Sequence, residues 1–192
     1  MNQFWVLNRE TILKTRAFDI QKVKLHLPDG REHTYGLVDH ADAVSLLPVD
    51  QTGRVYFVSQ YRIGSGDVLL ELPAGVMDEG EESDTSARRE LREEIGMDCQ
   101  ALINLGGFYM SPGYANEYMN VYLALGLHPA PLEQDEDEFL ELTSYPLEVA
   151  YQKAWGGEIR DSKTLATLLL ALPELLKRFP ELADKLSDRC LQ

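Results

Sequence analysis

Residues 75–97 constrain the fold more than any other part of the chain, because their spacing predicts one amphipathic helix. Ala87, Leu91 and Ile95 recur at four-residue intervals and form a stripe that a helix would bury. Gly96 follows directly, where a helix commonly ends in the left-handed conformation that glycine adopts most easily. The apolar stripe must pack on other elements, so this helix predicts a layered globular domain.

The same helix carries three glutamates on one side. Glu90, Glu93 and Glu94 fall within a sector of about 100°, next to the apolar stripe. Their mutual repulsion costs a few tenths of a kcal/mol per pair, and Arg89 and Arg92 can offset part of it. Such a local conflict is typical of functional sites, and clustered carboxylates suit Mg²⁺ or Mn²⁺. The pattern is also typical of a solvated helix face, so the helix alone leaves both interpretations open.

Strand patterns surround this helix, and helical patterns follow. Strands are expected over residues 46–49 and 55–59, on either side of a turn at 50–53, and over residues 68–72, 101–110 and 118–125. Helices are expected after a Ser83 or Asp84 cap, from Pro146 to Gly156-Gly157, over Ser162–Leu172 after an Asp161 cap, and from Pro173 onward. This order predicts an α/β fold, a mixed sheet layered with helices.

The N-terminal part has a pattern of its own. Apolar residues alternate with polar ones between positions 23 and 27, Asp29-Gly30 predicts a hairpin turn, and residues 33–38 can return as the partner strand. A length of 192 residues fits one domain with a small appendage. We therefore expect a small antiparallel β unit over residues 1–40 and the main domain over residues 41–192.

The charge balance limits the partners. The chain has 18 basic and 32 acidic residues, which gives a net charge of −14. A protein that binds nucleic acid by neutralising phosphates needs the opposite sign, so nucleic acid is excluded as a partner. The excess carboxylates form a solubilising surface, or some of them hold divalent cations. Such cations would let an acidic protein accept a phosphorylated small molecule.

Cysteine usage and hydropathy indicate the compartment. Cys99 and Cys190 form no disulfide or metal-binding pattern. No stretch approaches the roughly 18 consecutive apolar residues of a membrane span. The first ten residues lack the charged and apolar regions of a signal peptide. We expect a cytoplasmic protein with no membrane partner.

Residues 75–97 also resemble the signature of the Nudix hydrolase family. That signature is a glycine, five residues, Glu, seven residues, Arg-Glu, an aliphatic residue, one residue, Glu-Glu, one residue, a glycine and an aliphatic residue. Its nine defined positions are filled by Gly75, Glu81, Arg89, Glu90, Leu91, Glu93, Glu94, Gly96 and Met97. The last position is the soft one, because methionine stands where the family usually has Ile, Leu or Val.

The resemblance implies a Nudix fold, with a mixed β-sheet sandwiched between helices, and hydrolysis of a nucleoside diphosphate linked to another moiety. It implies that Glu90 and Glu94 hold Mg²⁺ or Mn²⁺, that Glu93 often joins them, and that the carbonyl of Ala74 completes the protein ligands. Arg89 is expected among the catalytic residues as the partner that orients these carboxylates. Glu81, which precedes the helix, is expected to support the site without binding the metal.

Three features outside the signature resemble the ADP-ribose pyrophosphatase branch of the family. They are Gln60-Tyr61-Arg62 followed by Glu71-Leu72-Pro73-Ala74-Gly75, the turn Ser111-Pro112-Gly113 with its proline sixteen residues beyond Gly96, and the acidic run that leads into residues 136–141. Sugar-nucleotide members share some of these features. The resemblance implies substrate contacts from Arg62, Glu71, Gly75, Ser111, Pro112 and Gly113.

The resemblance also implies a general base in the acidic run and a dimer. Glu138 is the expected base, with Glu136, Glu141 or Glu93 as substitutes. ADP-ribose would give AMP and ribose 5-phosphate. The branch usually forms homodimers through its N-terminal strands, and a 40-residue β unit is too small to be stable alone.

Several alternatives stay open. The substrate can be another nucleotide-sugar or ADP-compound, such as GDP-mannose, ADP-glucose or NADH. A non-catalytic Nudix domain that senses a nucleotide is a further alternative, although all three helix glutamates are present and no basic patch or DNA-binding segment is visible. Trp5, Tyr35 and Tyr56 are candidates for stacking on a nucleobase, and each can equally serve in packing.

Overall fold

The computed structural model describes residues 3–134 and 139–187. The chain divides into two compact units. The first comprises Met1–Asp42 and Phe108–Tyr118, and the second comprises Ala43–Gly107 and Met119–Gln192. Within the described ranges, no helix is both long and apolar enough to cross a membrane.

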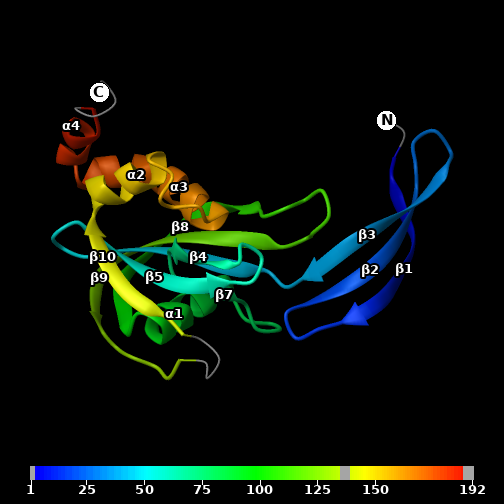
Figure 1. The fold of residues 1–192 in the computed structure, drawn as a ribbon, viewed down its shortest axis with the longest axis horizontal. Helices are drawn as coiled ribbons and strands as arrows, with labels where there is room; N and C mark the ends of the chain where they lie inside the picture. The colour runs from blue at the N-terminus through cyan, green and yellow to red at the C-terminus, as the bar shows by residue number, and fades with distance from the viewer. Residues whose placement is uncertain (1–2, 135–138, 188–192) are drawn as a thin grey trace. The chain divides into compact units, whose positions relative to one another are not determined.

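The first unit is built on a three-stranded antiparallel sheet in the order β1-β2-β3 (Figure 1). Its strands are β1 (Trp5–Lys14), β2 (Phe18–His26) and β3 (Glu32–His40). The turn between β2 and β3 places Gly30 at a φ of 88°, and the amide of Leu27 donates to the carbonyl of Arg31 at 2.8 Å. The predicted hairpin around Asp29-Gly30 is therefore confirmed.

The second unit is built on a seven-stranded mixed sheet with the main order β10-β5-β4-β9-β8. Its strands are β4 (Ala43–Val49), β5 (Arg54–Arg62), β6 (Asp67–Glu71), β7 (Ala74–Val76), β8 (Met97–Tyr109), β9 (Tyr118–Pro129) and β10 (Glu141–Pro146). β4 runs parallel to β9 and antiparallel to β7, while β6 joins the edge of β5. The mixed sheet predicted from the sequence is confirmed.

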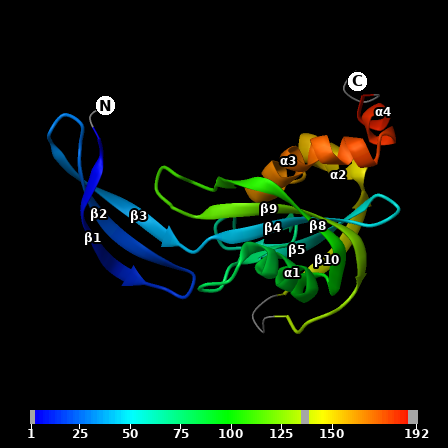
Figure 2. The same ribbon diagram turned by 180° about the vertical axis from the view of Figure 1, so that it is seen from behind.

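Helices cover both faces of this sheet (Figure 2). They are α1 (Ser83–Glu94), α2 (Leu147–Trp155), α3 (Ser162–Arg178) and α4 (Glu181–Ser187). β4 is buried along its whole length because its side chains alternate between the two layers. Val44 and Leu46 pack in the cluster that contains Leu91 of α1, whereas Leu47 and Val49 pack with α2, α3 and α4. The sheet is thus sandwiched between helices, as the family resemblance implies.

The ends of α1 follow the predicted pattern only in part. Gly96 has a φ of 70°, which confirms it as the left-handed residue after the helix. The predicted cap is wrong, because α1 begins at Ser83 after Glu82, whose side chain caps nothing. The side chains of Ser83 and Asp84 instead lie 2.7 and 2.6 Å from the hydroxyl of Tyr122. That contact attaches the start of the helix to β9.

The C-terminal helices confirm two predicted boundaries and correct a third. α2 begins after Pro146 and ends at Trp155, with Gly156 as its C-terminal cap. The carboxylate of Asp161 accepts the amide of Thr164 at 2.9 Å and caps α3 as predicted. Pro173, however, lies inside α3 and opens no helix. Pro173 is exposed, so water can satisfy the carbonyl that its missing N–H leaves unbound, and the buried residues on the opposite side keep the helix intact.

Candidate active site

The predicted carboxylates lie where α1 packs against the short strand β7. Glu90 and Glu94 are 6% and 3% exposed. The amide of Ala74 donates to the carboxylate of Glu94 at 3.1 Å. A Cβ atom on Gly75 would lie 2.0 Å from the carboxyl carbon of Glu90, so only glycine leaves room for that carboxylate. The structure therefore brings Ala74, Gly75, Glu90 and Glu94 together at one place in the second unit.

Arg89 connects the acidic residues of this site. Its Nε and Nη2 atoms bind the carboxylate of Glu81 at 3.1 and 2.9 Å, and its Nη1 lies 2.6 Å from Glu90 and 2.9 Å from Glu93. Nη2 also donates to the carbonyl of Val76 at 3.1 Å. The hydrogen bonds to Glu81 are the main reason that the pKa of Arg89 is raised, and they lower the pKa of Glu81. One guanidinium thus offsets part of the repulsion among three carboxylates.

The residues present fit a hard divalent cation. Glu90 and Glu94 are buried oxygen donors on one helix face, and the missing side chain of Gly75 leaves the space that Glu90 occupies. Glu93 is turned to Arg89 in this arrangement. Within residues 3–134 and 139–187, no three Asp, Glu, His or Cys side chains converge closely enough to hold a metal ion by themselves. A backbone carbonyl and water would have to complete the ligands, as is usual for Mg²⁺.

Arg62 and Glu71 form a second charged group in the same unit. The Nε and Nη2 atoms of Arg62 bind the two oxygens of Glu71 at 2.9 and 2.7 Å. The side chain of Glu71 is 1% exposed and that of Arg62 is 40% exposed. These hydrogen bonds raise the pKa of Arg62, and the negative charges of Asp161 and Glu94 add to the effect. The predicted contact of both residues with substrate stays a prediction.

Sequence reasoning missed a further member of this group. Lys163, in the first turn of α3, contacts the buried carboxylate of Glu71, and its Nζ lies 3.0 Å from Asp161. A signal for it was present in the sequence. A lysine in the first turn of a helix opposes the helix dipole, and a nearby carboxylate such as the capping Asp161 offsets that cost, but this signal does not indicate Glu71.

The remaining predicted site residues lie in the first unit, at the start of β10 or outside the described residues. Ser111, Pro112 and Gly113 belong to the first unit, where the carbonyl of Ser111 accepts the amides of Tyr114 and Ala115. Their role in binding substrate stays a prediction. Glu136 and Glu138 lie outside the described residues, and Glu141 is exposed at the start of β10.

The aromatic candidates lie in different surroundings. Trp5 stacks on His26 with ring centroids 3.8 Å apart and is 50% exposed. Tyr35 is 44% exposed. Tyr56 packs against the core on the α1 side of the sheet, which indicates a packing role for its ring.

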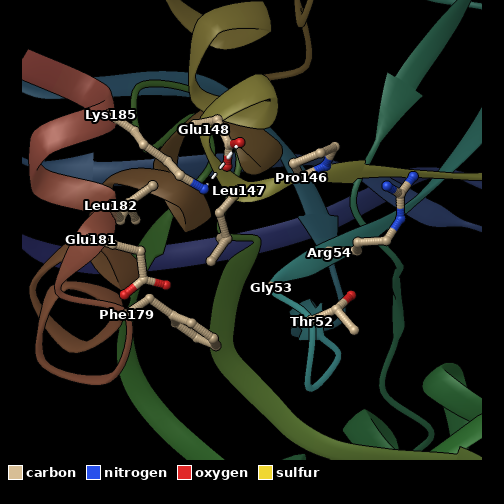
Figure 3. Close-up of a pocket in the computed structure, with 10 residues that line it drawn as sticks. All are labelled: Thr52, Gly53, Arg54, Pro146, Leu147, Glu148, Phe179, Glu181, Leu182 and Lys185. Atoms are coloured by element: carbon tan, nitrogen blue, oxygen red, sulfur yellow. Dashed lines mark hydrogen bonds and ion pairs between the residues drawn. The ribbon is translucent and has the colours of Figure 1, made fainter. Parts of the chain in front are cut away.

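A pocket of about 270 Å³ lies elsewhere in the second unit (Figure 3). It is lined by the turn between β4 and β5 and by residues of α2 and α4, among them Glu148 and Lys185, which pair at 3.3 Å. None of the predicted site residues lines it. The candidate active site is therefore defined by its charged side chains and not by this hollow.

The fold and the site together define a Nudix hydrolase. A model of the NUDIX domain matches residues 39–168, and the chain belongs to this family. Enzymes of the family generally use divalent metal ions.

Two relatives and one solved structure are similar over most of the chain. The ADP-ribose pyrophosphatase of Bacillus subtilis (strain 168) is 36% identical over 172 residues, which cover 88% of this chain and 93% of the relative. The methanol dehydrogenase activator of Bacillus methanolicus is 35% identical over 176 residues, which cover 89% and 94%. A crystal structure of an ADP compounds hydrolase superimposes with a TM-score of 0.81 at 27% identity, covering 92% of this chain and 96% of that one.

Proposed function

We propose that this Nudix pyrophosphatase hydrolyses ADP-ribose to AMP and ribose 5-phosphate in the presence of Mg²⁺, with Mn²⁺ as a possible substitute. The observation that carries the proposal is the pair of buried carboxylates, with Glu90 in the space that Gly75 leaves and Glu94 bound by the amide of Ala74. The relative named ADP-ribose pyrophosphatase supports the choice of substrate, because its similarity extends over 88% of this chain.

The metal ligands would be Glu90, Glu94 and the carbonyl of Ala74, with Glu93 joining them. The bound cation would neutralise the pyrophosphate oxygens and lower the pKa of the attacking water. Arg89 would keep Glu90 and Glu93 in place, since its Nη1 atom already lies within 3 Å of both carboxylates.

Arg62 would bind a phosphate oxygen of the substrate. Glu71 occupies its Nε and Nη2 atoms, and Nη1 has no hydrogen-bond partner among the residues that the structure describes. The half-exposed guanidinium therefore presents one edge for a charge-assisted hydrogen bond. Gly75 would let the pyrophosphate approach the backbone, and Ser111, Pro112 and Gly113 would contact the substrate. Glu71, with its side chain 1% exposed, would act by holding Arg62.

Glu138 would position the attacking water and accept its proton. Replacing Glu138 with Gln removes the acceptor without changing the side-chain shape, so kcat should fall by about 100-fold or more. Steady-state kinetics on the Glu138→Gln, Glu136→Gln and Glu141→Gln variants measures this. Near-normal activity in Glu138→Gln would move the base to whichever of the other glutamates, including Glu93, shows the loss.

A substrate panel tests the function itself. The purified protein is given Mg²⁺ with ADP-ribose, ADP-glucose, NADH and GDP-mannose, and the products are identified by chromatography. We expect the highest kcat/KM with ADP-ribose, and AMP and ribose 5-phosphate as its products. A higher kcat/KM with another member of the panel would assign that substrate class. Tight binding without turnover of any member would indicate a nucleotide sensor.

We further propose that the protein is a homodimer formed through the first unit. The β1 strand and its flanking residue expose large apolar side chains, including Phe4, Trp5, Ile12 and Leu13, which are 49–64% exposed. A row of exposed apolar residues on an edge strand is typical of an interface. A second copy of the chain is the partner that the family resemblance implies.

A further inference from the structure

Lys163 is a buried cation that has no role in the proposed reaction as described above. Its side chain is 10% exposed, although lysine is almost never buried unless it is paired. It contacts Glu71 on β6 and lies 3.0 Å from Asp161, the residue that caps α3. Burying an ammonium group is costly, and these two carboxylates offset the cost.

Four charges alternate along one chain of contacts. Asp161 pairs with Lys163, Lys163 pairs with Glu71, and Glu71 binds Arg62 through two hydrogen bonds. The first three side chains are between 1% and 11% exposed, and Arg62 at the end is 40% exposed. The series therefore starts in the protein interior and ends at an accessible guanidinium.

The start of α3 is also tied to the carboxylate site. The hydroxyl of Thr164 accepts the amide of Leu72 at 2.9 Å in a buried contact. Two residues further along the chain, Ala74 donates to Glu94. The first turn of α3 thus holds the segment that carries both Glu71 and the proposed backbone ligand of the metal.

We propose that Lys163 is a positioning residue for substrate binding, which acts by fixing Glu71 so that Arg62 presents its free edge to a phosphate oxygen. The proposal rests on the proposed function, in which Arg62 binds phosphate. Lys163 touches no reacting atom in it. The ammonium group of Lys163 offsets part of the negative charge of Glu71. The electrostatic attraction of the Arg62 guanidinium for a phosphate anion is therefore reduced less by Glu71.

Loss of the lysine charge should therefore weaken substrate binding. With Lys163→Met, Glu71 would be neutralised by Arg62 alone, and the guanidinium would be drawn to the carboxylate. We expect KM to rise about tenfold, the effect of losing one charge-assisted hydrogen bond, while kcat changes less than about threefold. Lys163→Arg keeps the charge and should restore most of the affinity.

A double-mutant cycle separates positioning from general structure. If Lys163 acts through Arg62, the double variant Arg62→Met/Lys163→Met should have the same KM as Arg62→Met within about threefold. If the fold increases in KM of the two single variants multiply in the double variant, the proposal is overturned. Calorimetric binding of the α,β-methylene analogue of ADP-ribose should show the same pattern, because that probe is not hydrolysed.

Control variants distinguish a positioning role of Lys163 from a purely structural one, and the wild type tests the substrate assignment separately. Lys153→Met removes an ion pair with Glu158, whose side chain is 64% exposed, and should leave KM unchanged. A lower Tm of Lys163→Met with an unchanged KM would reduce Lys163 to a structural residue and overturn the proposal. If Lys163→Met does not fold, Lys163→Gln, which keeps a hydrogen-bond donor and loses the charge, should give the rise in KM, and a normal KM there would overturn the proposal. Wild-type protein that hydrolyses the panel without preference for ADP-ribose overturns the substrate assignment only, and the cycle is then measured with the best substrate.

Discussion

Gly75 shows how a single methyl group can decide whether the site forms. In Gly75→Ala the new Cβ atom would meet the Glu90 carboxylate at 2.0–2.2 Å, so one of them must move. Displacing a reactive group by about 1 Å can cost about 100-fold in rate, and overpacking typically costs about 1–3 kcal/mol of stability. We expect both losses, measured by steady-state kinetics and thermal unfolding.

Gly64→Ala is the matched control for that experiment. A Cβ atom on Gly64 meets nothing within 4 Å, so the substitution should leave both rate and Tm close to wild type. If Gly75→Ala retains the wild-type rate, Glu90 does not need its observed position and the proposed ligand set is wrong.

The second prediction at this scale concerns the charge of Glu94. Glutamine can still accept the amide of Ala74, so Glu94→Gln should keep its fold while it loses a ligand charge. We expect kcat to fall at least about 100-fold and Tm to stay the same or rise, because one like charge is removed from the helix. A variant with full activity would refute the metal assignment. Glu174→Gln, which changes an exposed pair with Lys177, serves as the control.

Single residues also show what the sequence could and could not reveal about the site. Glu90 and Glu94 were predictable, because the helical period places them on one side and the family signature assigns their spacing. The contacts of Glu71 with Lys163 were not, since the two residues are 92 positions apart and join only when α3 packs on the sheet. A one-dimensional pattern contains no information about such a long-range pair.

At the scale of the elements, the turn between β4 and β5 is stabilised by a titratable residue, Asp50. Asp50 accepts the amides of Thr52 and Arg54 at 2.8 and 3.0 Å. Burial alone would raise the pKa of Asp50, but these hydrogen bonds outweigh it and lower the pKa. The stability that they provide is therefore present above the unfolded-state pKa of about 3.9 and is lost as the pH falls through the lower folded-state pKa.

Asp50→Asn should consequently destabilise the protein in a pH-dependent way. At pH 7 we expect a loss of about 1–2 kcal/mol in the free energy of unfolding, from weaker acceptance of two or three hydrogen bonds. The difference from wild type should shrink at pH 3, which lies below the unfolded-state pKa of about 3.9. Urea unfolding at both pH values measures it, and a difference that does not vary with pH would show that the charge of Asp50 contributes nothing.

Two of the strands that the sequence missed, β7 and β10, share a physical cause. β7 is three residues long and exists because it pairs with β4, whereas its Pro-Ala-Gly context predicts only the end of a strand. β10 follows an acidic run and forms by pairing with β5. α1, by contrast, has a complete period of apolar residues and was predictable from local sequence. Pairing partners decide these two strands, and a local pattern decides α1.

At the scale of the whole molecule, the exposed β1 strand predicts the oligomeric state. A dimer of the 21.7 kDa chain should have about twice that mass by light scattering, because a second copy would cover the apolar side chains of the first unit. Replacing Ile12 and Leu13 with Asp should shift the mass toward the monomer. A wild-type protein that stays monomeric at micromolar concentration would contradict the proposed dimer.

Arg89 has a consequence for the order in which the enzyme is assembled. Because one guanidinium holds Glu81, Glu90 and Glu93, helix α1 would be able to pack on the sheet during biosynthesis before a metal ion binds. Loading with metal would then be the last step of maturation. The concentration of free cation would then set the catalytic rate. The stability of the folded chain would depend on its own packing.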